Sequence, residues 1–325
     1  MAQPKQRGSG WMIVLMVCVW VLIACALVVA DDGTIKFAVI ADHRDNFDGL
    51  DTALEFIHAQ AVDFLIVVGD FDPVAQAYPD YYAMWRFEVR EDFLPQNQNL
   101  YFVMGNHDTP PAGADFFQTQ IAPLYPDNGP SGAPRGTIFS FDTGKIHMVI
   151  TNQYYGYPEG GYTQEQLNWI DEDLALSQQS IKFVFGHEPA FPMDRHVGDS
   201  LDIDPAMRDQ FWSILENNNV QAFFCGHTHH LSVIQHQGVY QIDAGEVKAN
   251  HLSITIVEVD SHMAIARLYE TDGSLPEPNS NDNVFNSNLE DAYKGDEAYT
   301  IVFSSDFGSG EDPWWGCFIQ NARGL

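Results

Sequence analysis

The sequence predicts an α/β fold in which two β-sheets pack against each other between flanking helices. Five short apolar runs have the length and composition of buried strands, and they cover residues 37–41, 64–68, 100–104, 181–185 and 223–225. Amphipathic segments lie between these runs, an order typical of sheets covered by helices. Short alternating segments then follow one another from residue 231 to 269, which indicates antiparallel strands.

Helices and strands alternate in the first part of the body. Residues 47–61 place apolar side chains at helical spacing, and residues 63–68 form the strand that follows. Residues 81–93 are aromatic and charged at helical spacing and predict another helix. Residues 109–136 are rich in Pro and Gly, so we expect a long loop over the functional site.

The second part continues with a hairpin and two helices. Residues 137–141 and 146–151 read as its two strands. The segment Thr163–Ser177 predicts a helix, because Thr163 and Gln166 form a capping box at its start. A further helix is expected over Met207–Asn217, and the last strands are expected at residues 238–242, 253–259 and 263–268.

The N-terminal residues 1–30 have the composition of a signal peptide or membrane anchor. Residues 1–10 are polar with two cations, and residues 11–30 are apolar throughout. Three alternatives stay open: cleavage after Ala30, an uncleaved anchor, and a lipoprotein with its lipid on Cys25. Each of them predicts a protein body outside the cytoplasm, either secreted, periplasmic or anchored to the membrane.

The remaining chain divides into a main domain and a tail. The strand and helix patterns place the domain at residues 36–270. Residues 271–325 form an acidic polar linker and a short C-terminal extension, in which residues 300–315 regain aromatic side chains. We expect this last segment to supply an extra edge strand to the main sheet.

Charge and cysteine content restrict the partners. The chain has 45 acidic and 15 basic residues, a formal net charge of −30. Such a surface repels nucleic acid and anionic membranes, so we expect no nucleic-acid-binding surface and membrane contact only through the N-terminal segment. Two of the four cysteines, Cys18 and Cys25, lie in the leader, which leaves no basis for a disulfide framework.

Residues able to bind metal follow the five apolar runs. They are Asp42, the pair Gly69-Asp70, the run Gly105-Asn106-His107-Asp108, the pair Gly186-His187, and the run Gly226-His227-Thr228-His229. Strand ends that share one edge of a sheet bring such residues together. Mixed carboxylate, amide and imidazole ligands suit a divalent or trivalent transition metal.

This ordered set resembles the calcineurin-like metallophosphoesterases, a superfamily that includes purple acid phosphatases and cyclic-nucleotide phosphodiesterases. The resemblance covers about residues 36–270. It implies a four-layer α/β/β/α sandwich with a dinuclear metal site at the strand ends, occupied by two ions of Fe, Mn or Zn. Asp70 would bridge the ions; one would be completed by Asn106, His187 and His227, the other by Asp42 and His229.

The same resemblance implies the chemistry of phosphoester hydrolysis. A metal-bridging hydroxide would attack phosphorus in line. His107 would face the phosphate and either protonate the leaving oxygen or stabilise developing charge, and Asp108 would orient His107. Apart from the resemblance, His196 in the loop after His187 is a further candidate for contact with the substrate. The run Tyr154-Tyr155-Gly156-Tyr157 either lines the pocket or forms a structural aromatic loop.

The chain departs from the family pattern at position 44. The first motif of the family usually reads Asp-x-His, whereas this sequence reads Asp42-His43-Arg44. Arg44 cannot bind a cation. Two interpretations stay open: Arg44 contacts the substrate phosphate, or His43 takes the place of the missing ligand.

The sequence thus predicts an exported metal-dependent phosphoesterase that acts on small phosphomonoesters or phosphodiesters. The alternative is a catalytically weakened metal-binding protein of the cell surface on the same fold. Retention of His107 and Asp108 favours the enzyme, because a protein that only binds needs no acid. Arg44 favours the alternative.

Overall fold

The computed structural model describes residues 33–71, 100–108, 117–157, 159–193, 195–260, 263–271 and 299–303. The apolar leader, the helix expected at residues 81–93 and most of the expected linker at 271–298 lie outside these ranges. Within them, no helix combines the length and the apolar composition that crossing a membrane would require.

The first sheet joins parallel and antiparallel strands. Its strands are β1 (Ile35–Ile40), β2 (Phe64–Val68), β3 (Leu100–Val103), β10 (Val247–Lys248), β11 (His251–Val259), β12 (Ala264–Thr271) and β13 (Tyr299–Phe303). The order is β13-β12-β11-β1-β2-β3, and β10 pairs with β11. Strands β1, β2 and β3 are parallel, and the rest are antiparallel.

The second sheet is built from the middle of the chain. Its strands are β4 (Phe139–Thr143), β5 (Ile146–Ile150), β6 (Ile181–Phe185), β7 (Ala222–Cys225), β8 (Leu231–His236) and β9 (Val239–Ala244). The order is β4-β5-β6-β7-β9-β8, with β5, β6, β7 and β9 parallel. The two edge strands, β4 and β8, are antiparallel to their neighbours.

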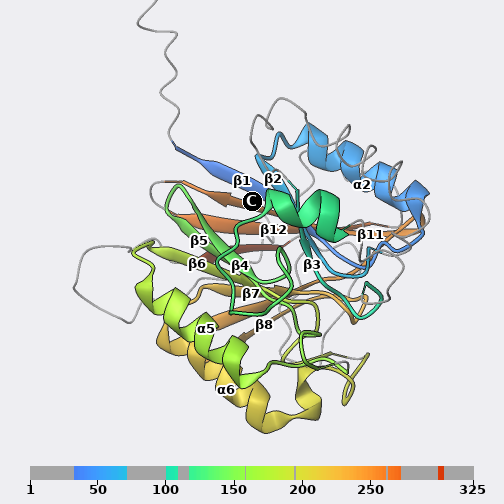
Figure 1. Ribbon diagram of the computed structural model, residues 1–325. Coiled ribbons are helices and arrows are strands. Elements are labelled where there is room, and N and C mark those ends of the chain that lie inside the picture. Colours follow the sequence, from blue (N-terminus) through green and yellow to red (C-terminus); the bar gives the residue numbers. More distant parts are fainter. Residues whose placement is uncertain are drawn as a thin grey trace, which may run out of the picture.

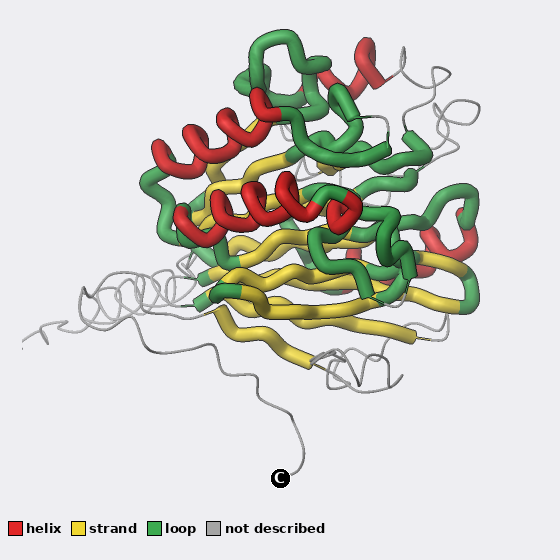
Figure 2. Tube along the Cα trace, turned by 90° about the horizontal axis from the view of Figure 1, so that it is seen from below, coloured by secondary structure: helices red, strands yellow, loops and turns green. Residues whose placement is uncertain are grey.

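Helices cover the outer faces of both sheets, so the predicted sandwich of two sheets between helices is confirmed (Figure 1). Helix α2 (Phe47–Ala59) lies over the first sheet, and α5 (Gln164–Leu176) and α6 (Pro205–Asn217) lie over the second. Viewed from below, two helices run side by side across the strands (Figure 2). Thr163 caps α5, because its Oγ1 accepts the N–H of Gln166 at 3.1 Å. The expected return bond of a capping box is replaced, since the Gln166 side chain bonds the backbone N–H and carbonyl of Asn152 at 3.0 Å each.

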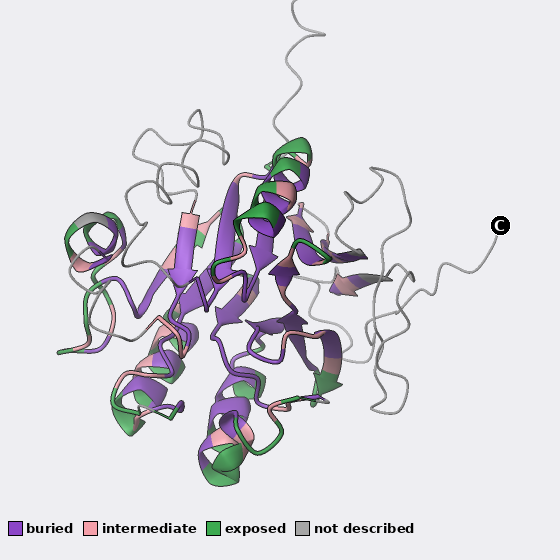
Figure 3. Ribbon diagram, turned by 90° about the vertical axis from the view of Figure 1, so that its right-hand side faces the viewer, coloured by how far each residue is buried: buried purple, intermediate pink, exposed green. Residues whose placement is uncertain are grey.

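Side chains that alternate in direction along a strand pack in two separate interfaces, one between the two sheets and one between the second sheet and its helices. Phe183 and Phe185 of β6 face the first sheet, where their rings contact Phe37 with centroid distances of 5.8 and 6.3 Å. Val184, between them, packs instead in the cluster that contains Leu167 of α5. Successive strand residues point to opposite faces, so one strand serves both interfaces. Figure 3 shows the resulting layers, with buried strands inside and helices exposed only on their outer sides.

The antiparallel strands after residue 231 differ from the expectation of one consecutive set. The hairpin β8–β9 belongs to the second sheet and β11–β12 to the first. The short segment Gly245–Asn250 carries the chain from one sheet to the other. Alternating polarity specifies antiparallel pairing but not the sheet that a hairpin joins, because both sheets bury one face in the same way. The expected edge strand is β13, which pairs with β12.

Three smaller elements complete the described chain. The loop expected at residues 109–136 contains, in its described part, a π-helical turn at Phe117–Ile121 and a 3-10 turn at Ala122–Leu124. A second 3-10 turn, Leu201–Ile203, precedes α6. Helix α6 begins two residues before the expected start because Asp204 caps it and Pro205 occupies its first position.

Parallel register gathers the functional loops at one edge. In the first sheet, Ile40 lies opposite Val67 and Val68 lies opposite Val103. In the second sheet, Phe185 lies opposite Phe224, and Cys225 lies opposite Asp243. The loops that follow β1, β2, β3, β6, β7 and β9 therefore leave the two sheets on the same side.

Candidate metal centre

Hydrogen bonds between the two sheets lock these loops together. The backbone N–H of His227, after β7, donates to Oδ2 of Asp42, after β1, at 2.8 Å. The ring Nδ1 of His187, after β6, lies 2.8 Å from the carbonyl oxygen of Val68 at the end of β2. Asp42 and His187 are fully buried. The site is thus made of side chains that neither sheet presents alone.

The backbone is strained where these side chains lie. Among described non-glycine residues, nine have positive φ, and six of those belong to the site or its rim: Asp42, Arg44, Asp70, His196, His227 and His229. This left-handed region is costly for residues with a Cβ atom. Strain concentrated in this way is typical of functional loops, where the surrounding structure maintains it.

Glycines let the loops approach each other closely. At Gly69, φ is +94°, and an added Cβ would collide with the ring of His187. At Gly226, an added Cβ would collide with the Asp42 carboxylate. These contacts explain why glycine precedes the metal-capable residues in both motifs.

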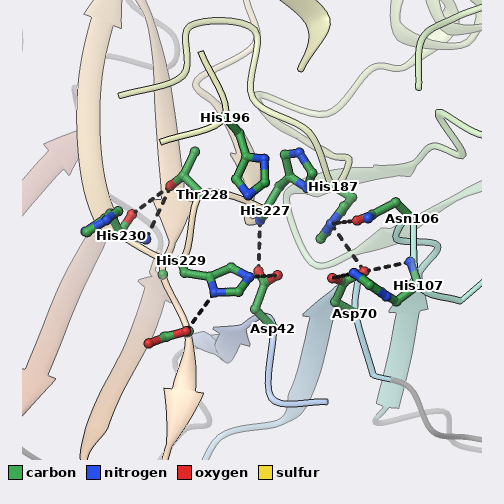
Figure 4. Close-up of polar contacts among 12 residues, drawn as sticks. Asp42, Asp70, Asn106, His107, His187, His196, His227, Thr228, His229 and His230 are labelled. Atoms are coloured by element: carbon green, nitrogen blue, oxygen red, sulfur yellow. Dashed lines mark hydrogen bonds and ion pairs between the residues drawn. The ribbon is translucent and has the colours of Figure 1, made fainter. Parts of the chain in front are cut away.

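Five predicted ligands bring hydrogen-bond-accepting atoms with lone pairs together in what we call the acceptor cluster: Asp42, Asp70, Asn106, His187 and His229 (Figure 4). The ring Nε2 of His187 lies 3.1 Å from Oδ1 of Asn106 and 3.4 Å from Oδ1 of Asp70. Nε2 of His229 lies 3.3 Å from Oδ1 of Asp42. Ligand atoms of Asp42, Asp70 and His187 all lie within 4.8 Å of one another.

The hydrogen bonds around the cluster leave its lone pairs pointing inward. With its Nδ1 proton donated to the Val68 carbonyl, neutral His187 has only a lone pair on Nε2, which faces two oxygen acceptors. Oδ1 of Asp42 is buried and accepts no hydrogen bond from the described residues. A buried carboxylate oxygen without a hydrogen bond, beside the lone pair of a neutral imidazole, favours a bound cation, and these ligand types fit transition metals.

Charge effects on the ring pKa values agree with this arrangement. Burial lowers the pKa of His187, but the carboxylates of Asp70 and Asp42 outweigh it and raise the value to about 9. Burial also opposes ionisation of Asp70, yet His187 and the N–H of His107 outweigh it and lower its pKa. The carboxylates therefore favour a positive charge at this place, which a metal ion would supply in place of a proton.

His227 occupies the rim between the cluster and a neighbouring loop. Its Nε2 lies 3.0 Å from the backbone carbonyl of Asp199, and burial with the charge of His187 lowers its pKa to about 3. The ring of His196 lies 4.1 Å from that of His227, centroid to centroid, and pairs with Asp199 at 3.2 Å. His196, His227 and Asp199 form a second group with ligand atoms within 4.8 Å.

The three residues considered for substrate contact or for the missing ligand differ in exposure: His107 and Arg44 are partly exposed, and His43 is buried. The side chain of His107 is 38% exposed, and its ring Nε2 lies 3.8 Å from Oδ2 of Asp70. The backbone N–H of His107 donates to Oδ1 of Asp70 at 3.1 Å. Arg44 is half-buried, and its backbone N–H donates to the Asp70 carbonyl. Its guanidinium forms no ion pair with the described residues. His43 is fully buried, and burial lowers its pKa to about 4.

The carboxylate of Asp108 contacts backbone N–H groups of two loops, and its predicted orientation of His107 stays a prediction. Its carboxylate accepts the backbone N–H groups of Asp70, Gly105 and Phe71 at 2.8, 2.8 and 3.1 Å. Burial and the nearby Asp70 raise its pKa to about 8. Asp108 thus ties the loop after β3 to the loop after β2. Asp108 lies three residues after Gly105, and an aspartate at this distance can accept the glycine N–H and cap the turn. The spacing of the motif is the same whether the carboxylate caps the turn or contacts His107.

Sequence reasoning missed several side chains around the cluster. Glu246 contacts Nδ1 of His229 at 2.8 Å, and Asp243 accepts the hydroxyl hydrogen bond of Thr228 at 2.7 Å. Glu188 accepts the hydroxyl of Tyr154 at 2.8 Å, and burial raises its pKa to about 7. In the sequence, Glu246 follows the strand expected at residues 238–242, and that position alone does not indicate a contact with His229.

Comparison with known proteins gives a consistent result. The family model described as calcineurin-like phosphoesterase matches residues 35–231. The chain is similar to tartrate-resistant acid phosphatase type 5 of Rattus norvegicus, with 25% identity over 254 residues, which are 69% of this chain and 76% of the relative. It is also similar to a cAMP/cGMP dual specificity phosphodiesterase of Mycobacterium tuberculosis, with 25% identity over 206 residues and 62% of this chain.

Coverage of the relatives is partial. The chain spans 58% of the length of that phosphodiesterase, and 26% of an uncharacterised protein of the same species to which it is 28% identical over 142 residues, 39% of this chain. In fold it is similar to a dimetal phosphatase from Danio rerio, with a TM-score of 0.57 and 14% identity, covering 74% of this chain and 97% of the other.

Proposed function

Since the chain belongs to the calcineurin-like phosphoesterase family, we propose that it is an exported hydrolase that cleaves phosphoric ester bonds with two transition-metal ions. The observation that carries this proposal is the acceptor cluster, in which carboxylate, amide and imidazole ligand atoms converge around the unbonded, buried Oδ1 of Asp42 and the Asp42–Asp70–His187 group. Export is supported by the apolar residues 11–30. The relatives include both a phosphodiesterase and an acid phosphatase, so small monoesters and diesters are both candidate substrates.

Each residue of the acceptor cluster, together with His227 at its rim, has a proposed part. Asp70 would touch both ions; Asn106, His187 and His227 would complete one, and Asp42 and His229 the other. When bound, the ions would supply a water that ionises near neutral pH as the attacking hydroxide, and positive charge against the phosphate oxygens.

Two residues at the rim would act on the substrate itself. His107, a partly exposed imidazole beside Asp70, would protonate the leaving oxygen from the solvent side; its exposure and its distance of 3.8 Å from Asp70 support this part. Arg44, whose guanidinium has no partner among the described ion pairs, would bind the phosphate with its planar fork.

Hydrolysis of aryl phosphates tests the proposal. Nitrophenyl phosphate and bis(nitrophenyl) phosphate are incubated with the wild type, Asp70→Ala and Asp51→Ala in the presence of Mn²⁺, Fe²⁺ or Zn²⁺. Asp51 is an exposed acid on α2 and serves as the matched control. We expect equal rates for the wild type and Asp51→Ala and only background for Asp70→Ala. The ratio of rates for the two esters measures the preference for monoesters or diesters.

A second candidate function rests on Arg44. With arginine in place of the usual histidine, the ion beside Asp42 has one ligand fewer, which suits a weakened enzyme or a metal-binding protein of the cell surface. The same assay distinguishes the two: a protein that binds metal but leaves both esters intact is the binding protein.

A further inference from the structure

His229 lies between two carboxylates on opposite sides of its ring. Its Nε2 is 3.3 Å from Oδ1 of Asp42, inside the acceptor cluster (Figure 4). Its Nδ1 is 2.8 Å from Oε2 of Glu246, which follows β9. This distance lies within ion-pair range, although Nδ1 makes no hydrogen bond with the described residues in this geometry. A proton on Nδ1 would leave the lone pair on Nε2 for the side of Asp42. The side chains of His229 and Glu246 are only 12% and 13% exposed, so water screens this contact little.

Glu246 is itself fixed by neighbours on two other strands. Its second oxygen, Oε1, lies 3.4 Å from Nδ1 of His251 on β11, and its Oε2 also pairs with Lys248 of β10. The other nitrogen of His251 lies 2.6 Å from Oε1 of Glu270 on β12, which is 3% exposed. A continuous row of polar contacts thus runs from Asp42 at the end of β1 to Glu270 in the first sheet.

The two halves of the cluster depend on such support to different degrees. The half beside Asn106 has three side chains of its own in the proposed metal centre, whereas the half beside Asp42 has only Asp42 and His229. A carboxylate behind a ligating imidazole fixes its tautomer and ring orientation and increases its basicity. Because this half has few ligands, disturbing the orientation of one imidazole would lower the affinity for the ion by a large factor.

We propose that Glu246 is the positioning residue of His229, and that it sets the affinity of the metal ion held by Asp42 and His229, with His251 and Glu270 holding Glu246 in place. This inference rests on the proposed metal centre. It assigns Glu246 no contact with substrate or ion, only an action through His229.

Metal titration of the metal-depleted protein separates this inference from the proposed function. Calorimetric titration with Mn²⁺ and the visible absorption of bound Co²⁺ are measured for the wild type, Glu246→Gln, Glu246→Asp and His251→Gln. The control is Glu258→Gln on β11, whose carboxylate pairs with Arg267 instead. We expect two binding steps in the wild type and in the control. In Glu246→Gln, one step weakens about 10- to 100-fold and the other keeps its affinity.

The remaining variants sharpen the test. Glu246→Asp keeps a carboxylate and is expected to recover part of the lost affinity, and His251→Gln is expected to weaken the same step by a smaller factor. Equal affinities in Glu246→Gln and the wild type overturn the inference, as does an equal loss at both steps together with a lower melting temperature of the metal-free protein. A wild type that binds neither metal overturns the proposed function instead.

Discussion

Nε2 of His187 lies 3.4 Å from Oδ1 of Asp70, and these two side chains come from different sheets. The contact exists because Gly69 leaves room for the imidazole ring and because the Val68 carbonyl holds its Nδ1 at 2.8 Å. The acceptor cluster therefore forms only where the two sheets pack against each other. Changes to the backbone near this contact affect both stability and metal binding.

Gly69→Ala is expected to damage fold and site together. The new Cβ meets the His187 ring, and φ at this position is +94°. Gly238→Ala is the control, because Gly238 has a similar φ of +87° but no atom within 4 Å of the added Cβ. Denaturant unfolding should show a loss of about 1–2 kcal/mol for Gly238→Ala from the left-handed backbone. Overpacking should add about 1–3 kcal/mol for Gly69→Ala. Equal losses in both variants contradict the contact.

His107→Ala is expected to lower turnover about 100- to 10,000-fold, because a proton donor to the leaving oxygen is removed. Metal content should stay at the wild-type value, since His107 is not one of the proposed ligands. The loss should be smaller for nitrophenyl esters, whose leaving group needs no proton, than for alkyl esters. His58→Ala, at an exposed histidine of α2, provides the control. Loss of metal from His107→Ala would make His107 a ligand and refute the proposed part.

Arg44→Ala is expected to reduce kcat/KM about 10- to 100-fold, mainly through KM, as a charge-assisted bond to phosphate is worth about 1.5–3 kcal/mol. Arg44→Lys keeps the charge without the planar fork and should recover part of the loss. Arg208→Ala removes an arginine that pairs with Asp209 on α6 and should leave the kinetics unchanged. Unaltered kinetics in Arg44→Ala would exclude a contact with phosphate.

His147 is expected to make stability depend on pH. It is buried between two carboxylates, Asp142 at 2.6 Å and Asp173 at 2.9 Å. Burial lowers the pKa of His147, but the hydrogen bonds to Asp173 and Asp142 outweigh it and raise the pKa above 6.5. The protonated ring therefore stabilises the fold fully below pH 6.5, and this contribution is lost as pH rises through the higher folded-state pKa.

Thermal unfolding of His147→Gln at a series of pH values measures this contribution. The wild type should exceed the variant in stability most at acidic pH, above the range of general acid denaturation, and the difference should shrink as the pH rises above 6.5. A difference that grows with pH would show that the neutral ring is the stabilising form.

Local patterns were sufficient for most of the fold. The capping box at Thr163 and the helical spacing in α2 and α6 predicted these helices to within two residues at most ends. Apolar runs followed by Asp, Asn and His predicted which strand ends share an edge. Both signals are contained in a few consecutive residues. The parallel register of the strands then brings the loops after them to the same edge.

Contacts between distant loops were not predictable in the same way. The approach of His196 to His227 depends on the path of the loop before Leu201–Ile203, and the contact of Glu246 with His229 depends on the crossing between sheets after β9. The role of Asp108 depended on which N–H groups its carboxylate reaches. Spacing along the chain carries no information on these distances, because each is set by tertiary packing.

The central claim is that the acceptor cluster binds two metal ions and that phosphoester hydrolysis requires them. The most direct measurement is the hydrolysis rate of metal-depleted protein as Mn²⁺, Fe²⁺ or Zn²⁺ is added back in known amounts, with bound metal determined by elemental analysis of the same samples. We predict no hydrolysis without metal and a rate that rises until two ions are bound per chain. Hydrolysis that persists after complete metal removal, or two bound ions without any hydrolysis of either aryl ester, would contradict the claim.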